Sequence, residues 1–299
     1  MNNPIIVGTL ALDTVETPFG RKEGVLGGSA CYAALAASFF SHPGIVAVAG
    51  NDFPEEHLKL LSDKNINLDG LERTGKTFRW EGSYEYDMNE AHTKKTELNA
   101  LSDFKARLPD SYRLATHIFL ANIDPELQMK VVEQLENPEV IMLDTMNFWI
   151  ENKKDKLLEV MKKANIIVMN DGEARMLHDT ASLMKSAHET LKLGPEAVII
   201  KKGEHGSLLF TKGKHFNAPG YPLEALKDPT GCGDSFGGGL IGHLAKKGVM
   251  DDRALRKGIV LGSAIASYNA EDFSVGRLTS ITLADIEKRF GEMREMREF

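Results

Sequence analysis

The stretch "DPTGCGDSFGGGLIGHLAKKG", residues 228–248, decides how this chain is interpreted, because it gathers glycines where a helix is expected to begin. A glycine inside a helix costs about 1 kcal/mol relative to alanine. The Thr-Gly-Cys-Gly turn can present consecutive backbone N–H groups, and the helix start adds unpaired N–H groups and a partial positive charge. The sequence therefore predicts a helix over 234–247 preceded by an anion site at Gly231, Cys232 and Gly233.

Asp234 directly follows this turn. One role for an Asp at a helix start is an N-cap, whose side chain accepts a backbone N–H. Beside an anion site, the carboxylate can instead accept the proton of an attacking hydroxyl while the amides stabilise a transferring phosphoryl group. The turn is neither a Walker A loop, because no Gly-Lys-Ser/Thr follows, nor a dinucleotide-binding GxGxxG after a strand. Asp234 is therefore a candidate general base.

Short apolar runs alternate with helical patterns along the chain. Near-continuous apolar runs are typical of strands in a parallel sheet covered on both faces. They are found at 5–12, 45–50, 117–122, 140–144, 166–170 and 197–201. Further helices are expected at 29–40, 54–64, 125–135, 155–164, 171–178, 181–193, 251–268 and 282–296. This alternation predicts a doubly wound α/β domain.

Residues 76–88 differ from these apolar runs, because apolar and polar residues alternate along them. Alternation of apolar and polar residues predicts a strand with one apolar face, followed by a turn at 89–92 and a returning strand at 93–98. Residues 14–28 are a candidate for further strands of the same unit. The hairpin either covers the edge of the core or closes a site as a lid, and the pattern leaves both open. The apolar face consists of Phe78, Trp80, Tyr84, Tyr86 and Met88.

Composition narrows the class of protein. The chain has 299 residues, of which 42% are hydrophobic, and 36 basic residues stand against 43 acidic ones. A net charge of -7 argues against nucleic acid or a membrane surface as a partner. Cys31 and Cys232 are far apart and are expected to be reduced thiols, and no signal peptide or 18-residue apolar run is present. The sequence predicts a cytoplasmic protein.

Five motifs, in order along the chain, resemble those of the PfkB, or ribokinase-like, carbohydrate kinases. The stretch "DPTGCGDSFGGGL" resembles the C-terminal signature of the family, which reads roughly Asp-Thr-x-Gly-Ala-Gly-Asp-x-Phe. The others are Asp13 after the first strand, "GGSACYAALAA" (27–37), "NDGEARML" (170–177) and "KKGEHGSLLF" (201–210).

The resemblance covers nearly the whole chain. It implies one ribokinase-like domain over 1–299, with a mostly parallel sheet flanked by helices. A small β lid is expected from about 14–26 and 74–99.

The resemblance implies an acceptor site in the N-terminal part of the chain. Asp13 is expected to hold two substrate hydroxyls, beyond the carboxyl ends of strands where α/β sheets bind ligands. Gly27 and Gly28 are expected to bring the backbone against the substrate, ahead of Ser29, which alone reads as an ordinary N-cap. Ribokinase-type members often have Asn further along this signature, where this chain has Tyr32. That departure argues against ribose as the acceptor.

The resemblance also implies a site for ATP and Mg2+. Asn170 and Glu173 are expected near Mg2+ and the phosphates through water, since magnesium keeps several waters in proteins. The loop with Gly203 and Gly206 is expected along the phosphates, and which of Lys201 and Lys202 contacts them is left open. Asn269 and Gly276 are expected to flank adenine. No His/Cys cluster indicates a transition-metal site.

Asp144, Asn147 and Cys232 lie near these motifs, and each can have a purely structural role. Asp144 and Asn147 follow a strand, where they either face the cleft between phosphate donor and acceptor or form a strand-end turn, which is the favoured interpretation. Cys232 stands where the family commonly has Ala. A thiolate there would repel phosphate, so Cys232 is interpreted as a small packing residue of the anion loop.

The sequence thus predicts an ATP-dependent kinase that phosphorylates a hydroxyl of a sugar or sugar-like molecule. Asp234 is expected to act as base and the backbone of 231–234 as the anion site. A nucleoside kinase is the alternative, because the lid aromatics can stack on a base. A non-catalytic ligand sensor on the same fold is a third hypothesis. A homodimer through the lid strands is a hypothesis that rests only on the exposed hairpin edge, which invites pairing.

Overall fold

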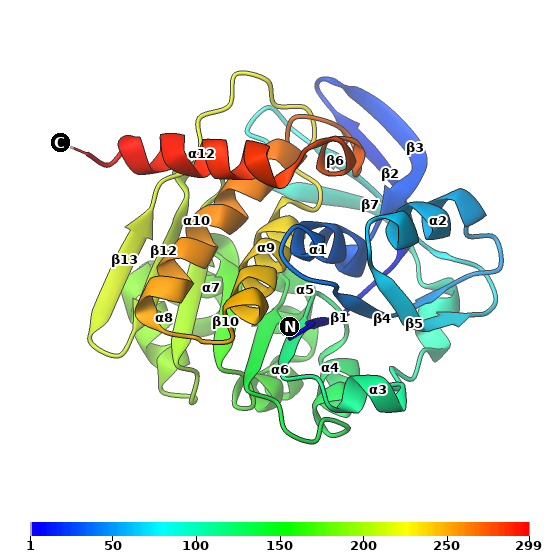
Figure 1. Cartoon of the computed structure of the whole chain (residues 1–299), viewed down its shortest axis with the longest axis horizontal. Helices are drawn as coiled ribbons and strands as arrows, with labels where there is room; N and C mark the ends of the chain where they lie inside the picture. Colours follow the sequence, from blue (N-terminus) through cyan, green and yellow to red (C-terminus); the bar gives the residue numbers. More distant parts are fainter. Residues whose placement is uncertain (1, 299) are drawn as a thin grey trace.

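The computed structural model describes residues 2–298, which form two sheets (Figure 1). In the larger sheet the strand order is β13-β12-β11-β10-β9-β8-β1-β4-β5, parallel from β11 to β5 and antiparallel at β12 and β13. Its strands are β1 (Ile5–Val7), β4 (Gly44–Ala49), β5 (Asn67–Arg73), β8 (His117–Leu120), β9 (Val140–Asp144), β10 (Ile166–Asn170), β11 (Ala197–Lys201), β12 (Ser207–Thr211) and β13 (Lys214–Ala218).

Helices cover both faces of this sheet, and alternate residues of each strand enter two separate cores. Ile6 and Phe119 belong to the first core, whereas Val7 and Leu120 belong to the second. The first core contains α1 (Ser29–Ser38), α2 (Glu55–Asp63), α9 (Cys232–Lys247), α10 (Asp252–Asn269), α11 (Gly276–Ser280) and α12 (Leu283–Glu295). The second contains α3 (Asp110–Arg113), α4 (Pro125–Val132), α5 (Asn147–Asn152), α6 (Lys154–Met161), α7 (Asp171–His178) and α8 (Leu183–Leu191).

The smaller sheet has the order β3-β2-β6-β7 and is drawn in blue and cyan in Figure 1. The chain leaves the larger sheet after β1 and again after β5 to build it. Its two hairpins are antiparallel, and β2 pairs with β6 in parallel. β3 and β7 are the edge strands of this sheet. Pairing of two chains through these edges stays a prediction. The strands are β2 (Ala11–Thr17), β3 (Gly20–Gly27), β6 (Phe78–Tyr84) and β7 (Ala91–Glu97).

The prediction of one strand over 5–12 is wrong. β1 ends at Val7 and β2 begins at Ala11 in the other sheet. The chain turns at Gly8, where a Cβ would lie 2.5 Å from Ser29 Oγ, the same oxygen that accepts the Thr9 N–H at 3.0 Å. Asp13 therefore lies inside β2 and does not follow the first strand.

The predicted hairpin forms, but its turn lies earlier than 89–92. Tyr84 pairs with Ala91, so the connection is formed by the residues between them. Tyr86 belongs to this connection and is 83% exposed, which removes it from the apolar face.

The predicted central strands and long helices are confirmed, with ends that differ by at most three residues. The strand-end turn expected at Asp144 and Asn147 is wrong at Asn147, which begins α5. The sequence missed β5 and β13, whose sequences "NLDGLER" and "KHFNA" contain many polar residues. Both are edge strands in which most residues are exposed or only partly buried, so neither needs a continuous apolar run.

The glycines after Asp234 are explained by packing. A Cβ on Gly237 would lie 2.5 Å from the Phe119 ring of β8, and one on Gly238 would lie 2.1 Å from the carbonyl oxygen of Ala33 in α1. Gly239 faces Gly262 of α10. α9 therefore sits between α1, α10 and the sheet at distances that no side chain permits. Among the described residues, no helix is both long and apolar enough to cross a membrane.

Candidate active site

Three neighbouring parallel strands of the larger sheet each have a polar residue at the carboxyl end. Asp144 is the last residue of β9, Asn170 of β10 and Lys201 of β11. Asn170 lies directly beside Lys201 in the register, and Lys201 Nζ lies 2.8 Å from Asp144 Oδ2. The two paired side chains are 18% and 5% exposed, so this ion pair is largely shielded from water. The carboxyl ends of the strands thus carry a buried cation.

The N-terminus of α9 faces this cation. The N-cap is Gly231, with φ of 76°, and no side chain caps the helix. A Cβ on Gly231 would lie 2.3 Å from the Tyr32 ring, so both the backbone conformation and the space require glycine. A Cβ on Gly233 would lie 2.9 Å from Lys201 Nζ. The first backbone N–H groups of α9 and the ammonium group of Lys201 therefore lie together.

Asp234 lies in the first turn of α9 and is not its N-cap. Burial and the nearby Asp144 carboxylate raise the pKa of Asp234 to about 7, against the opposing charge of Lys201. Burial lowers the pKa of Lys201, but Asp144 and Glu173 outweigh it and hold that pKa above its usual value. Asp234 can therefore exchange a proton near neutral pH, while Lys201 stays charged.

Asn170 and Glu173 form a capping box at the start of α7. The Glu173 carboxylate accepts the Asn170 N–H at 2.6 Å and the Asn170 Nδ2 at 2.8 Å, and the Glu173 N–H donates to Asn170 Oδ1 at 2.7 Å. Burial raises the pKa of Glu173. These hydrogen bonds fix Asn170 and Glu173 against each other beside Lys201, and their expected place near the phosphates stays a prediction.

Buried polar contacts hold residues 230–233, the predicted anion loop, against α10. Asn269 Nδ2 donates to the carbonyl of Thr230 at 2.7 Å, and Cys232 Sγ donates to the carbonyl of Ala266 at 3.4 Å. Burial raises the pKa of Cys232 to about 12, so this residue is a neutral thiol at neutral pH. Asp228 accepts the Thr230 N–H at 2.8 Å. The structure thus places Asn269, expected beside adenine, in full burial under the loop.

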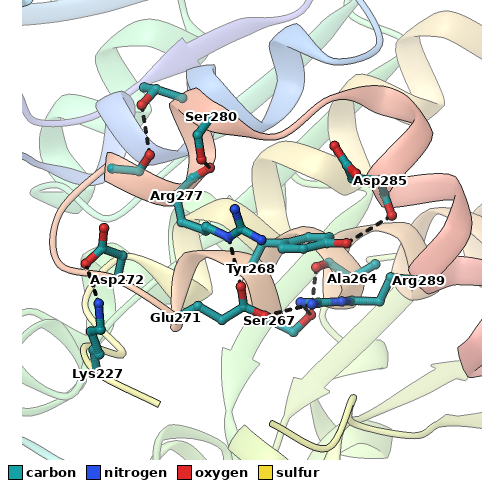
Figure 2. Close-up of polar contacts among 12 residues, drawn as sticks. Lys227, Ala264, Ser267, Tyr268, Glu271, Asp272, Arg277, Ser280, Asp285 and Arg289 are labelled. Carbon is teal, nitrogen blue, oxygen red and sulfur yellow. Dashed lines mark hydrogen bonds and ion pairs between the residues drawn. The ribbon is translucent and has the colours of Figure 1, made fainter. Parts of the chain in front are cut away.

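The end of α10 that carries Asn269 is itself braced by α12 (Figure 2). The guanidinium of Arg289 lies 3.4 Å from the ring centroid of Tyr268 and donates to Glu271 Oε1 at 2.7 Å. Glu271 Oε2 accepts from Arg277 Nε at 2.8 Å. These charged and stacked contacts fix the C-terminal end of α10, which carries Asn269, against α12.

Asp13 approaches from the smaller sheet. A Cβ on Gly27 would lie 1.9 Å from Asp13 Oδ2, and the Gly28 N–H donates to the same carboxyl group. Asp13 Oδ1 is buried without a hydrogen-bond partner among the described residues. Burial raises the pKa of Asp13 to about 8 despite the Gly28 N–H, and the Asp228 and Asp234 charges add to the rise. The expected contact of Asp13 with substrate hydroxyls stays a prediction.

Ser29 does not cap α1 as the sequence suggested. Gly28 is the N-cap, with φ of 97°. The Ser29 hydroxyl donates to the Asn122 carbonyl at 3.0 Å and accepts the Thr9 N–H. Its hydrogen bonds hold the connection between β1 and β2, and its expected contact with the acceptor stays a prediction.

Two tyrosines contact the turn before α9, one from the smaller sheet and one from α1. Thr230 Oγ1 donates to the Tyr84 hydroxyl at 3.3 Å across from β6. The Tyr32 ring lies against Gly231, and burial raises the pKa of both tyrosines. The sequence indicated Tyr84 only as an aromatic residue of the expected lid, and Tyr32 only as a replacement for the Asn that is common in the family signature. Neither contact has a sequence signal, because each joins residues far apart in the chain.

The remaining predicted positions lie in two loops. Gly203 and Gly206 have φ of 55° and 80° around the 3-10 helix η2 (Gly203–His205). A Cβ on Gly203 would lie 2.3 Å from Asn89 Oδ1, so the β6–β7 connection touches this loop. Gly276 begins α11, close to the Asp272 carboxylate. Their expected contacts with ATP stay predictions.

Comparisons with known proteins agree on one family. The family model described as "pfkB family carbohydrate kinase" matches residues 11–277. A cytidine kinase from Thermococcus kodakarensis is 28% identical over 249 residues, covering 81% of this chain and 88% of that protein.

Solved structures agree on the fold. The crystal structure of Methanocaldococcus jannaschii nucleoside kinase, an archaeal member of the ribokinase family, superposes with a TM-score of 0.79 at 23% identity, over 98% of this chain and 99% of that chain. An E. coli protein provisionally named ribokinase II, in complex with ATP and Mg2+, superposes with a TM-score of 0.77 at 18% identity, over 98% and 100% of the two chains.

Proposed function

Because this chain belongs to the pfkB family of carbohydrate kinases, and is therefore a phosphotransferase with a hydroxyl acceptor, we propose that it transfers the γ-phosphate of ATP to a sugar hydroxyl of a nucleoside. The observation that carries the proposal is the meeting of three groups. Asp234 lies in the first turn of α9, close enough to both Lys201 and Asp13 for their charges to interact.

The acceptor hydroxyl attacks the γ-phosphorus from the side of the smaller sheet. Asp13 and the Gly27–Gly28 backbone hold the sugar, so that the hydroxyl points at Asp234. Asp234 takes its proton as the O–P bond forms and the bond to the ADP oxygen breaks. The N–H groups of 231–234 stabilise the charge on the transferring phosphoryl oxygens.

ATP and Mg2+ fit the nucleotide side of the site. Asp144, Glu173 and Asp234 all lie close enough to Lys201 to interact with its charge, and burial favours the protonated form of Glu173 and Asp234. A divalent cation would favour the ionised carboxylates instead. Mg2+ prefers oxygen ligands and waters. Glu173 and Asn170 would hold its water shell, and Mg2+ would neutralise charge on the phosphates. The loop with Gly203 and Gly206 would lie along those phosphates. The ATP- and Mg2+-bound relative supports this assignment.

A nucleoside acceptor is favoured over a free sugar for two reasons. A cytidine kinase is 28% identical to this chain over 81% of its length. In this chain Tyr84 reaches across to the anion loop, and Trp80 lies on the same sheet with its ring over Gly82. Aromatic rings at the acceptor side can stack on a base, which a free sugar lacks.

The proposal is tested by measuring ADP release from Mg-ATP with cytidine, uridine, adenosine, inosine, ribose and fructose. We expect a nucleoside to give a kcat/KM at least tenfold above that of any free sugar. A sugar that equals the best nucleoside would contradict the nucleoside assignment and return the acceptor to the sugars. Tight nucleoside binding with no ADP release by any acceptor would support the sensor hypothesis.

The rate should rise with pH, because the base must be ionised. Asp234 has a pKa raised to about 7 and Asp13 one raised to about 8, so both are largely protonated below these values and charged above them. We expect kcat/KM for the acceptor to increase from about pH 6 to about pH 9 and then level off, because Asp13 is still partly protonated at about pH 8. Asp13→Asn should remove the upper part of this rise. A profile that is flat or falls over this range would exclude Asp234 as the base.

A further inference from the structure

Lys201 is a buried cation aimed at the anion loop. Its Nζ lies where a Cβ on Gly233 would be only 2.9 Å away, and it bonds Asp144 Oδ2 at 2.8 Å. Any anion that accepts the N–H groups at the start of α9 therefore lies within reach of this ammonium group. The adjacent Lys202 differs, because its ammonium group has no carboxylate partner among the described residues, and its backbone N–H donates to the carbonyl of Gly206.

Hydrogen bonds fix both the side chain and the backbone of Asp144. Its Oδ1 accepts the Thr145 N–H at 2.9 Å, and its carbonyl oxygen accepts from Gln128 Nε2 at 3.2 Å. The same Nε2 donates to the carbonyl of Ala121 at 3.1 Å, which ties the ends of β8 and β9 together. A flexible lysine side chain is thus held in one direction by a carboxylate that is itself immobile.

We propose that Lys201 is a catalytic residue that contacts the transferring phosphoryl group, and that Asp144 is the positioning residue that directs it there. This inference rests on the proposed function. The phosphoryl group carries its charge on three oxygens in the transition state, and a fixed cation in a site shielded from water stabilises that charge. Lys201 neither gains nor loses a proton. The acceptor proton goes to Asp234, and ADP leaves with the electrons of the broken P–O bond.

The competing explanation is an ion pair that only supports the fold. Removing one partner of such a pair leaves an unpaired buried charge, whereas replacing both partners by neutral residues is often tolerated. The single variant Lys201→Met therefore cannot separate the two explanations. The double variant Asp144→Asn/Lys201→Met can, because it removes both charges together.

The experiment compares the wild type, Lys201→Met, the double variant and the control Lys202→Met. We expect both variants that lack Lys201 to lose about 10²–10³-fold in kcat, as when one preorganised donor to a developing charge is removed. The KM of the acceptor should change little. The Tm should fall in the single variant and recover in the double variant, while the Lys202→Met protein keeps wild-type kcat.

A second readout needs no acceptor. The wild type should bind the imido analogue of Mg-ATP more tightly than Mg-ADP, and loss of Lys201 should abolish that preference. Recovery of wild-type kcat and of this preference in the double variant would overturn the proposal. A wild type that phosphorylates nothing but shows the Lys201-dependent preference would contradict the proposed acceptor reaction and leave the role of Lys201 supported.

Discussion

Asp234→Asn should lower kcat by roughly 10²–10⁴-fold, because asparagine keeps the size of the side chain but cannot take the acceptor proton. The N–H groups of α9 and Lys201 remain in place, so the KM values for ATP and the acceptor should change little. The measurement is steady-state ADP release with the best acceptor.

The same variant should not be less stable. The folded-state pKa of Asp234 is raised to about 7 from an ordinary value near 3.8, so the folded protein binds more protons than the unfolded chain between these values. The contribution of Asp234 to stability is therefore present at low pH and is lost as pH rises through about 7. Above that pH, Asp234→Asn should unfold at an equal or higher denaturant concentration.

Asp252→Asn is the matched control. Asp252 also lies in the first turn of a helix, α10, but it pairs with Arg256 at the surface. Its replacement should leave kcat unchanged. An Asp234→Asn protein that keeps wild-type turnover would remove Asp234 from the role of base, and a catalytic loss accompanied by unfolding would point to misfolding.

Gly238→Ala should destabilise the protein by about 1–3 kcal/mol or more, because the added methyl group overpacks the contact between α9 and α1. The new Cβ would lie 2.1 Å from the Ala33 carbonyl oxygen and 2.6 Å from its Cα, and neither backbone atom can move without shifting the helix. Chemical unfolding measures this loss. Because α1 also carries Tyr32, which lies against Gly231, activity should fall as well.

Gly291→Ala is the control for this variant. Gly291 lies inside α12, and a Cβ there would meet no atom within 4 Å. Alanine should therefore stabilise the helix by about 0.5–1 kcal/mol, the usual cost of glycine in a helix interior. A Gly238→Ala protein with wild-type stability would show that α1 and α9 separate at little cost, contrary to the close-packing explanation of these glycines.

The central strands could be predicted because their surroundings require one kind of residue. β9, β10 and β11 are covered on both faces, so nearly every residue in them is apolar and the runs are visible in the sequence. The edge strands β5 and β13 lack that requirement and were missed. The break between β1 and β2 was also hidden, because both strands contain buried apolar residues although they belong to different sheets.

The sequence by itself determined the α/β class, the anion loop and Asp234 as the candidate base, since these depend on local patterns of apolar residues and glycines. Only the tertiary structure decided that Asp144 meets Lys201 and that Tyr84 meets Thr230. It also placed Asn269 beneath the loop and assigned the later glycines of α9 to helix packing. These contacts depend on which strands are neighbours and on how closely helices approach, and neither property is encoded within any short segment of the chain.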